Sequence, residues 1–278
     1  MGRRRWVAAL LTLAGVAGGC SEPGDLLIAS TTSTEDSGLF DALLPAFTGA
    51  HPEYEVHLTA VGTGQALVLG RRKDADVLLV HSPAAESAFV AGGHGSVRCE
   101  VMYNDFVIVG PPSDPAGLAG MSDAPAALTR IAAAASSEES VRFVSRGDDS
   151  GTHRKERELW SSADLDPGGG WYLEVGQGMA EALRMATERR AYTVSDRATY
   201  LAQREGLGLQ VLVEGDERLF NQYGVIPVSG ARHPEAARAF ARWITGEEAQ
   251  ALIGAYGAER FGRPLFVPNA GECEVPAK

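Results

Sequence analysis

The 278-residue sequence lacks an excess of basic residues, a repeated motif and any recognisable set of metal ligands. It holds 25 Lys and Arg against 36 Asp and Glu, a net charge of −11 at pH 7. Proteins that bind nucleic acid depend on a basic footprint, so this balance argues against nucleic acid as a partner. No grouping of His, Cys, Asp and Glu has the spacing of a metal site, so we expect no bound cation.

No apolar run is long enough to span a bilayer, but the N-terminus has the features of a secretory signal peptide. A basic segment at residues 3–5 precedes an apolar one at 7–16, and small residues follow at 17–19. We therefore expect cleavage after residue 19 and export to the periplasm or the cell surface. Cys20 at the cut predicts a lipid anchor, although Ala17 stands where lipoproteins usually carry Leu. Ordinary cleavage near the same place is the alternative.

The chain has only three cysteines. With Cys20 assigned to the lipid, Cys99 and Cys273 remain, and in an oxidising compartment these two could pair. The sequence does not show whether their Cα atoms come close enough, so a disulfide and two free thiols both stay open.

Segments with strand and helix patterns alternate along the chain, as is typical of an α/β protein with mainly parallel sheets. The predicted strands are residues 26–29, 54–61, 77–80, 101–110, 141–144 and 219–228. The predicted helices are residues 37–47, 63–72, 83–90, 234–244 and 247–256, and residues 132–140 are interpreted as a helix end and surface loop.

Two of the predicted strands, 101–110 and 219–228, are long and enclose about a hundred residues with their own alternation of strands and helices. This arrangement predicts two lobes, with the chain crossing the hinge twice. Residues 25–105 and 220–270 would form lobe I, and residues 106–219 lobe II. Such lobes can close over a ligand. A single three-layer sandwich is the alternative.

Residues 145–153 contain the strongest candidate for a ligand site. They lie between a predicted strand and a polar helix, whose first N–H groups lack intrahelical partners and attract anions. Ser150 and Thr152 add hydroxyl groups there, and Arg146 adds a planar fork suited to oxyanions. Either Asp148 or Asp149 could orient the guanidinium. We therefore predict a site for a small, fully ionised oxyanion.

Other loops between strands and helices add candidates. Residues 30–34 are five consecutive hydroxyl residues, for which we expect ligand contacts, with ordinary helix capping as the alternative. Gly62 and Gly64 flank Thr63 and let the backbone approach a ligand, although Leu67 stands where a dinucleotide fingerprint needs glycine. Ser82 and Ser195 lie at similar junctions, where each could donate to the ligand or only cap a helix. His81 is interpreted as a structural residue.

A secreted serine hydrolase is a more distant alternative, because residues 147–151 resemble the nucleophile loop of chymotrypsin-like proteases. Those proteases are all-β, whereas this chain is rich in helical patterns. A serine nucleophile also needs a base within hydrogen-bonding reach, and His153 is expected to point away from Ser150.

Taken together, the loops resemble those of the tungstate-binding proteins of ABC importers, from about Leu26 to Pro268. The resemblance lies in residues 30–39, 62–66, 103–107, 145–153 and 193–201. The pattern Arg-x-x-x-Ser-Gly-Thr is shared with periplasmic phosphate-binding proteins, where it grips the anion. Here Arg146, Ser150, Gly151 and Thr152 fill it.

The resemblance implies a monomer with a two-lobe periplasmic-binding-protein fold of type II, which holds an oxyanion between its lobes without catalysis or cofactor. It implies delivery of the anion to a membrane permease powered by a separate ATPase. Thr31, Thr32, Ser33 and Thr63 would donate from one lobe, and Arg146, Ser150 and Thr152 from the other. Tungstate is the expected ligand, and a receptor for molybdate, sulfate or phosphate is the alternative.

Overall fold

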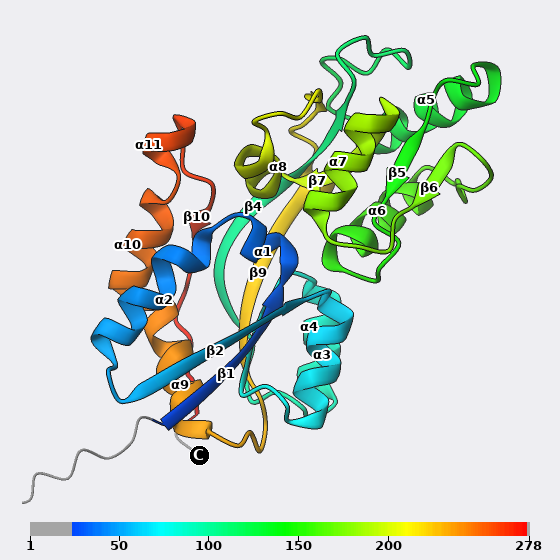
Figure 1. Cartoon of the computed structure of the whole chain (residues 1–278). Helices are drawn as coiled ribbons and strands as arrows, with labels where there is room; N and C mark the ends of the chain where they lie inside the picture. The colour runs from blue at the N-terminus through cyan, green and yellow to red at the C-terminus, as the bar shows by residue number, and fades with distance from the viewer. Residues whose placement is uncertain (1–23, 277–278) are drawn as a thin grey trace, which may run out of the picture.

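A computed structural model describes residues 24–276 of the chain as an α/β protein (Figure 1). The predicted signal peptide, residues 1–19, and Cys20 lie outside the described residues. The strands are β1 (Gly24–Thr31), β2 (Tyr54–Val61), β3 (Val77–Val80), β4 (Cys99–Gly110), β5 (Phe143–Ser145), β6 (Tyr172–Glu174), β7 (Tyr192–Asp196), β8 (Gln210–Val213), β9 (Phe220–Pro227) and β10 (Val267–Pro268). The helices are α1 (Thr32–Asp36), α2 (Leu39–Ala50), α3 (Thr63–Arg72), α4 (Pro83–Ala91), α5 (Ala124–Ser137), α6 (Gly151–Ser162), α7 (Met179–Arg189), α8 (Arg197–Gln203), α9 (Pro234–Ile244), α10 (Glu247–Ala255) and α11 (Ala258–Phe261), with a short 3₁₀ turn at Glu217–Leu219. Among these helices, none is both long and apolar enough to cross a membrane.

The strands form one mixed sheet in the order β2-β1-β3-β9-β4-β7-β5-β6, and β8 and β10 pair with β4. Strand β1 is parallel to its neighbours β2 and β3. At the other end of the sheet, β5 is parallel to its neighbours β6 and β7. The pairs that involve the long strands β4 and β9 are antiparallel. The predicted mainly parallel pairing therefore applies to the two ends of the sheet, where helical crossovers connect the strands.

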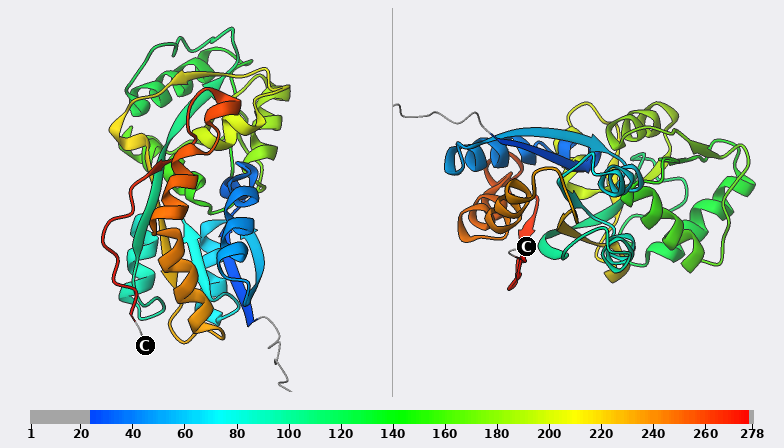
Figure 2. Two further views of the ribbon diagram at one scale, coloured as in Figure 1. Left: turned by 90° about the vertical axis from the view of Figure 1, so that its left-hand side faces the viewer. Right: turned by 90° about the horizontal axis from the view of Figure 1, so that it is seen from below.

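The long strand β4 changes partner along its length. It pairs with β9 over residues 99–105 and with β7 over residues 106–109. We call β1–β3, β9 and β10 with helices α1–α4 and α9–α11 the β1 half, and β5–β8 with helices α5–α8 the β7 half. The two halves lie one above the other, and β4 extends through both (Figure 2, left).

Each half has a hydrophobic core of its own. In the β1 half, Phe47 of α2 and Phe240 of α9 meet edge to face with ring centroids 5.2 Å apart. In the β7 half, Phe143 and Trp160 have the same arrangement at 5.2 Å. Buried aromatic pairs of this kind stabilise a fold through area burial and favourable ring geometry. Each half thus has the packing needed to keep its own shape.

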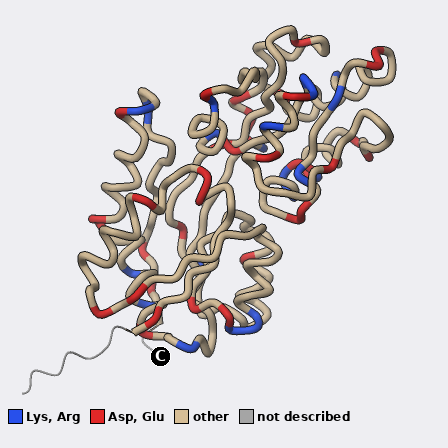
Figure 3. The backbone as a smooth tube through the Cα atoms, viewed as in Figure 1, with Lys and Arg blue, Asp and Glu red and all other residues tan. Residues whose placement is uncertain are grey.

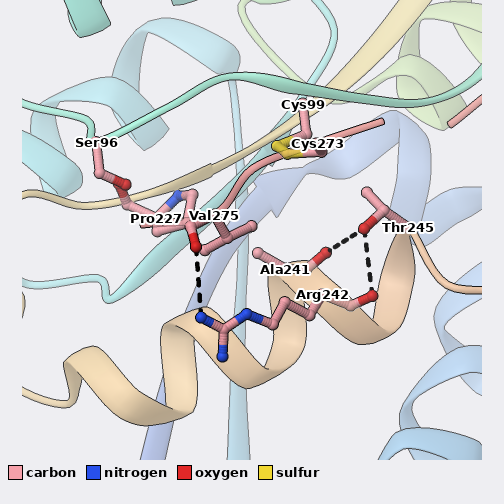
Figure 4. The surroundings of a disulfide bond; sticks show 8 residues. All are labelled: Ser96, Cys99, Pro227, Ala241, Arg242, Thr245, Cys273 and Val275. Atoms are coloured by element: carbon pink, nitrogen blue, oxygen red, sulfur yellow. Dashed lines mark hydrogen bonds between the residues drawn. A yellow bond between two sulfur atoms is a disulfide. The ribbon is translucent and has the colours of Figure 1, made fainter. Parts of the chain in front are cut away.

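A disulfide joins Cys99, at the start of β4, to Cys273 in the C-terminal segment (Figure 4). Their Cα atoms are 5.6 Å apart, a separation that a disulfide can bridge. Nearby, Arg242 of α9 donates from Nη2 to the carbonyl oxygen of Val275 at 3.3 Å. Both contacts fasten the segment that follows β10 to the β1 half.

Several predicted elements match the structure to the residue, among them strands 54–61 and 77–80 and helices 63–72 and 234–244. One prediction was wrong. The predicted loop after β1 contains helix α1, which Thr31 caps and which Gly38, at φ 77°, separates from α2. Residues 132–140, interpreted as a helix end and surface loop, contain the end of α5 at Ser137 and the loop that follows it.

Candidate functional site

Arg146 lies buried between the two halves, immediately after β5, with 2% of its surface exposed. Its Nη1 donates to Ser33 Oγ at 3.0 Å and its Nη2 donates to Thr32 Oγ1 at 3.2 Å. Thr32 and Ser33 begin α1 of the β1 half, so these hydrogen bonds connect the two halves. Because both hydroxyl oxygens accept from the guanidinium, their hydrogens stay free to donate to an anion.

Asp148 holds Arg146 in this position. One carboxylate oxygen pairs with Nη2 of Arg146, and the other accepts from the backbone N–H of Ser150 at 3.1 Å. Asp149 points elsewhere, pairing with Arg154 at 2.7 Å at the surface. The structure therefore identifies Asp148 as the carboxylate that orients the guanidinium, which the sequence had left open.

The N-termini of α3 and α6 meet beside the loop that contains Arg146 and connects β5 to α6. A Cβ atom at residue 62 would lie 3.3 Å from the carbonyl oxygen of Asp148 and 3.5 Å from Cα of Ser150. Gly62 therefore allows a contact between the backbones that a larger residue would obstruct. Two helix ends with unpaired N–H groups and positive dipole ends converge here, one from each half.

Several buried donors around this point lack a partner within the described part of the chain. They are Thr63 Oγ1, Thr152 Oγ1, Ser145 Oγ and Arg146 Nε. Thr63 and Thr152 are 0% and 1% exposed, and each is in the first turn of its helix. Buried polar atoms are nearly always hydrogen-bonded, because an unpaired one costs about 1–3 kcal/mol. Such a set of donors fits an acceptor-rich ligand, which an oxyanion is.

Three other predicted ligand residues have structural contacts of their own. Thr31 Oγ1 accepts from the N–H of Thr34 at 3.3 Å and caps α1. Ser150 Oγ accepts from the N–H of His153 at 3.2 Å and caps α6, which leaves its hydrogen free to donate. Ser195 Oγ donates to the carbonyl oxygen of Asp196 at 2.9 Å, so its hydrogen is already used.

Ser82 and Gly151 line a separate cavity of about 350 Å³, together with residues such as Phe106, Lys155 and Phe220. Among the hydrogen bonds of the described residues, none connects Ser82 with Arg146. Gly151 is needed for packing, because a Cβ atom there would lie 2.8 Å from Cε1 of His81. Its backbone N–H still belongs to the first turn of α6.

A chain of buried polar side chains near Arg146 was not expected from the sequence. His81 Nδ1 lies 3.0 Å from Asn221 Oδ1, Asn221 donates to Asn104 Oδ1 at 2.7 Å, and Asn104 donates to Asp196 Oδ1 at 3.5 Å. Burial lowers the pKa of His81 to about 4 and raises that of Asp196. Asn104 and Asn221 face each other in the β4–β9 register, so matching positions on the two long strands were the available signal.

The geometry around Ser150 does not form a hydrolase site. The imidazole Nδ1 of His153 accepts from the backbone N–H of Asp149 at 3.1 Å. It is the backbone N–H of His153, and not its ring, that bonds to Ser150 Oγ. A nucleophile and its base need to be within hydrogen-bonding reach of each other, and this pair lacks that contact.

One group of metal-ligating side chains occurs among the described residues, at Asp25, Glu55 and His57. The pairing of β1 with β2 brings them within 4.8 Å of one another, which explains why no sequence spacing revealed them. All three are exposed, and His57 Nε2 lies 3.2 Å from Asp25 Oδ1 as in a surface ion pair. The group lies far from Arg146 in the fold, and these surface contacts explain why the three side chains are close together.

Acidic residues are distributed over both halves of the molecule (Figure 3). At moderate ionic strength, charges more than about 10 Å away are largely screened. Local donors in a buried site can therefore dominate its electrostatics, even in a chain of net charge −11.

Comparisons with known proteins agree with this geometry. A family model described as a PBP superfamily domain matches residues 19–248. The tungstate-binding protein TupA of Peptoclostridium acidaminophilum is 51% identical over 255 residues, which cover 90% of this chain and 87% of that protein. The solved structure of the tungstate ABC transporter from Geobacter sulfurreducens is 47% identical, covers 84% of this chain and 98% of its own, and has a TM-score of 0.74. The tungstate-binding protein TupA of Desulfovibrio alaskensis G20 is 44% identical with a TM-score of 0.71, covering 89% of this chain and 100% of its own.

Proposed function

The chain belongs to the PBP superfamily and, within it, to the family of the tungstate-binding proteins TupA, and we propose that it binds tungstate for an ABC importer. It is a binding protein and not an enzyme. The observation that carries the proposal is the group of buried donors, Thr63 Oγ1, Thr152 Oγ1 and Arg146 Nε, for which the described residues supply no partner. A tetrahedral oxyanion offers acceptors in several directions at once, which matches donors that converge from separate segments.

We assign Thr32, Ser33 and Thr63 of the β1 half and Arg146, Ser150 and Thr152 of the β7 half as the residues that contact the anion. The backbone N–H groups at the starts of α3 and α6 add neutral donors. Thr31 and Ser195 support the loops instead, since their hydroxyl groups bond to the protein. Ser82 faces a different cavity and is not part of the proposed set.

The carboxylate acceptors near the site affect whether an ionised or a protonated anion is preferred. Both oxygens of Asp148 accept from the protein, one from Arg146 and one from the N–H of Ser150, so its carboxylate is directed at these donors and less toward a protonated anion. Tungstate is fully ionised at neutral pH, whereas phosphate is partly protonated. In the part of the chain that the structure describes, Asp196 Oδ2 is buried without a hydrogen-bond partner, which makes phosphate the second ligand to test.

We further propose that the two halves act as lobes, with residues 25–105 and 220–270 in lobe I and residues 106–219 in lobe II. The change of partner along β4 and the separate cores support this division. An anion held by donors from both lobes binds the closed arrangement better than the open one and shifts the equilibrium toward closure. The closed form would then be recognised by the permease, whose transport is powered by a separate ATPase.

The proposed location is outside the cytoplasmic membrane, with residues 1–19 as a signal peptide and Cys20 as the site of the lipid anchor. The basic, apolar and small residues of this segment support export. Fatty-acid labelling of the wild-type chain and of Cys20→Ala tests the anchor, because only the wild type should carry label.

Isothermal titration of the purified protein with tungstate, molybdate, sulfate and phosphate tests the function. We expect tight binding of tungstate and much weaker binding of sulfate and phosphate. Equal affinity for molybdate would make the protein a receptor for both anions. Binding of phosphate alone would contradict the proposed ligand, and binding of none of the four would contradict the function itself.

A further inference from the structure

Hydrogen bonds connect α1 to the β7 half without using the groups that we propose donate to the anion. Asp36 Oδ2 accepts from the backbone N–H of Ala180 in α7 at 3.4 Å. Gln203 of α8 donates to the carbonyl oxygen of Asp36 at 3.4 Å, and Thr199 of α8 donates to the carbonyl oxygen of Ser33 at 2.9 Å. Helix α1 thus lies next to α7 and α8, which are drawn above it in Figure 1.

Helix α7 has no cap from its own sequence. Its N-cap residue is Gly178, which has no side chain to accept from the first-turn N–H groups. Glu181, the acidic residue of this turn, pairs with Arg184. Asp36 supplies the missing acceptor from the other half, at the end of the helix where a carboxylate also interacts favourably with the dipole.

Asp36 is close enough to the anion site for this contact to matter there. Thr32 and Ser33 are on the same short helix and accept from Arg146. The position of these two hydroxyl groups therefore depends on how α1 is held. Arg146, Asp196 and Glu181 are the charged groups that act on Asp36, and burial raises the pKa of its carboxyl to about 6.

We infer that Asp36 is a positioning residue for anion binding, whose carboxylate caps α7 across the interface and holds α1 in the arrangement that the ligand requires. The inference rests on the proposed oxyanion-binding function. It adds a contact between the halves that strengthens binding without touching the anion. Glu35, the neighbouring carboxylate on α1, is exposed and provides a matched control.

The test measures tungstate affinity by isothermal titration for the wild type and for Asp36→Ala, Asp36→Asn and Glu35→Ala. Because the contact joins the two halves, its loss disfavours the closed arrangement that binds the anion, and the loss of a cap of typical strength there should weaken binding about five- to tenfold in Asp36→Ala. Asn caps about as well as Asp, so Asp36→Asn should stay within about threefold of the wild type. Glu35→Ala should bind as the wild type does.

A second pair of variants changes the N-cap residue of α7 instead of Asp36. It therefore tests the same contact even if Asp36→Ala does not fold. Gly178 has φ −62° and ψ 168°, which any residue can adopt, and a Cβ atom there would meet its nearest neighbour at 3.4 Å. Gly178→Ser gives α7 its own cap, whereas Gly178→Ala adds the Cβ atom alone. We expect Gly178→Ser to bind tungstate about threefold more weakly than Gly178→Ala, and Asp36→Ala to cost much less when it is combined with Gly178→Ser.

The outcomes separate the inference from the proposed function. If the wild type binds tungstate and both Asp36→Ala and Gly178→Ser bind equally well, the role of Asp36 is wrong while the function stands. Equal losses of tungstate affinity in Glu35→Ala and Asp36→Ala would also contradict the role of Asp36, since equal losses would reflect the removal of a charge alone. If the wild type binds none of the four oxyanions, the function fails and the inference fails with it.

Discussion

Asp148 pairs with the guanidinium of Arg146 through one oxygen and accepts from the backbone at the start of α6 through the other. A single carboxylate therefore fixes the cation relative to the helix end. Its negative charge is offset by two donors, so it orients the site more than it repels an anion. This arrangement is compatible with an acidic pair that follows, in the sequence, the arginine that we propose binds the oxyanion.

Asp148→Asn should lower tungstate affinity about tenfold, at the lower end of the 10- to 100-fold that the loss of an orienting partner costs at metal sites. Asp149→Asn is the control, since Asp149 pairs with Arg154 at the surface. Both variants change the charge by the same amount. Isothermal titration should show the loss in Asp148→Asn alone, and a gain in affinity there would mean that repulsion outweighs orientation.

Arg146→Ala should reduce tungstate binding by about 3 kcal/mol, roughly a hundredfold, because it removes a charged donor from a buried site. Arg154→Ala removes the same charge from a partly exposed position and should change affinity little. Circular dichroism checks that both variants fold. If titration gave wild-type affinity for Arg146→Ala, the site would be assigned to the wrong residues.

Thr152→Val should move stability and binding in opposite directions. The variant replaces an unpaired buried hydroxyl with a methyl group, so the free energy of unfolding without ligand should rise by about 1 kcal/mol. Tungstate affinity should fall by about the same free energy, because a donor to the anion is lost. The measurements are urea unfolding and titration.

Thr199→Val is the matched control for that experiment. Its hydroxyl group is also buried but donates to the carbonyl oxygen of Ser33 at 2.9 Å. Replacing it should therefore lower the free energy of unfolding instead of raising it. A loss of stability in Thr152→Val would indicate that its hydroxyl group has a partner in the ligand-free protein.

Much of the fold and of the site could be predicted because the responsible signals are local. Arg146 and Thr152 were proposed from one strand-to-helix junction, which the structure places after β5 and at the start of α6, and the strand at 54–61 was predicted from its alternation. The helix at 32–36 was missed because five hydroxyl residues in a row indicate a loop, whereas one of them, Thr31, is enough to cap a helix. Asp36, Asn104 and Asn221 carry no local signal, since the contacts that join them to Ala180, Asp196 and one another span 92 or more positions.

The buried carboxyl of Glu156 in α6 predicts how stability varies with pH. Its Oε1 accepts from Tyr172 Oη at 2.6 Å and from Trp160 Nε1 at 3.2 Å. Burial raises the pKa of Glu156 from 4.5 to about 7, against the smaller opposing effect of these hydrogen bonds. The folded state therefore binds a proton more tightly than the unfolded chain does.

Because the protonated carboxyl is favoured in the folded state, its contribution to stability is full below pH 4.5 and is lost as the pH rises through about 7. Glu156→Gln keeps an acceptor at this position and cannot ionise. The free energy of unfolding of the variant should therefore exceed that of the wild type by up to about 3 kcal/mol at pH 8, and the difference should vanish near pH 4.5.

Glu158→Gln, which changes an exposed carboxylate paired with Lys155, should show no such trend. Urea unfolding across this pH range makes the comparison. A constant difference between Glu156→Gln and the wild type would mean that the pKa of Glu156 is the same in the folded and unfolded states, so that its hydrogen bonds and nearby charges fully offset the cost of burial.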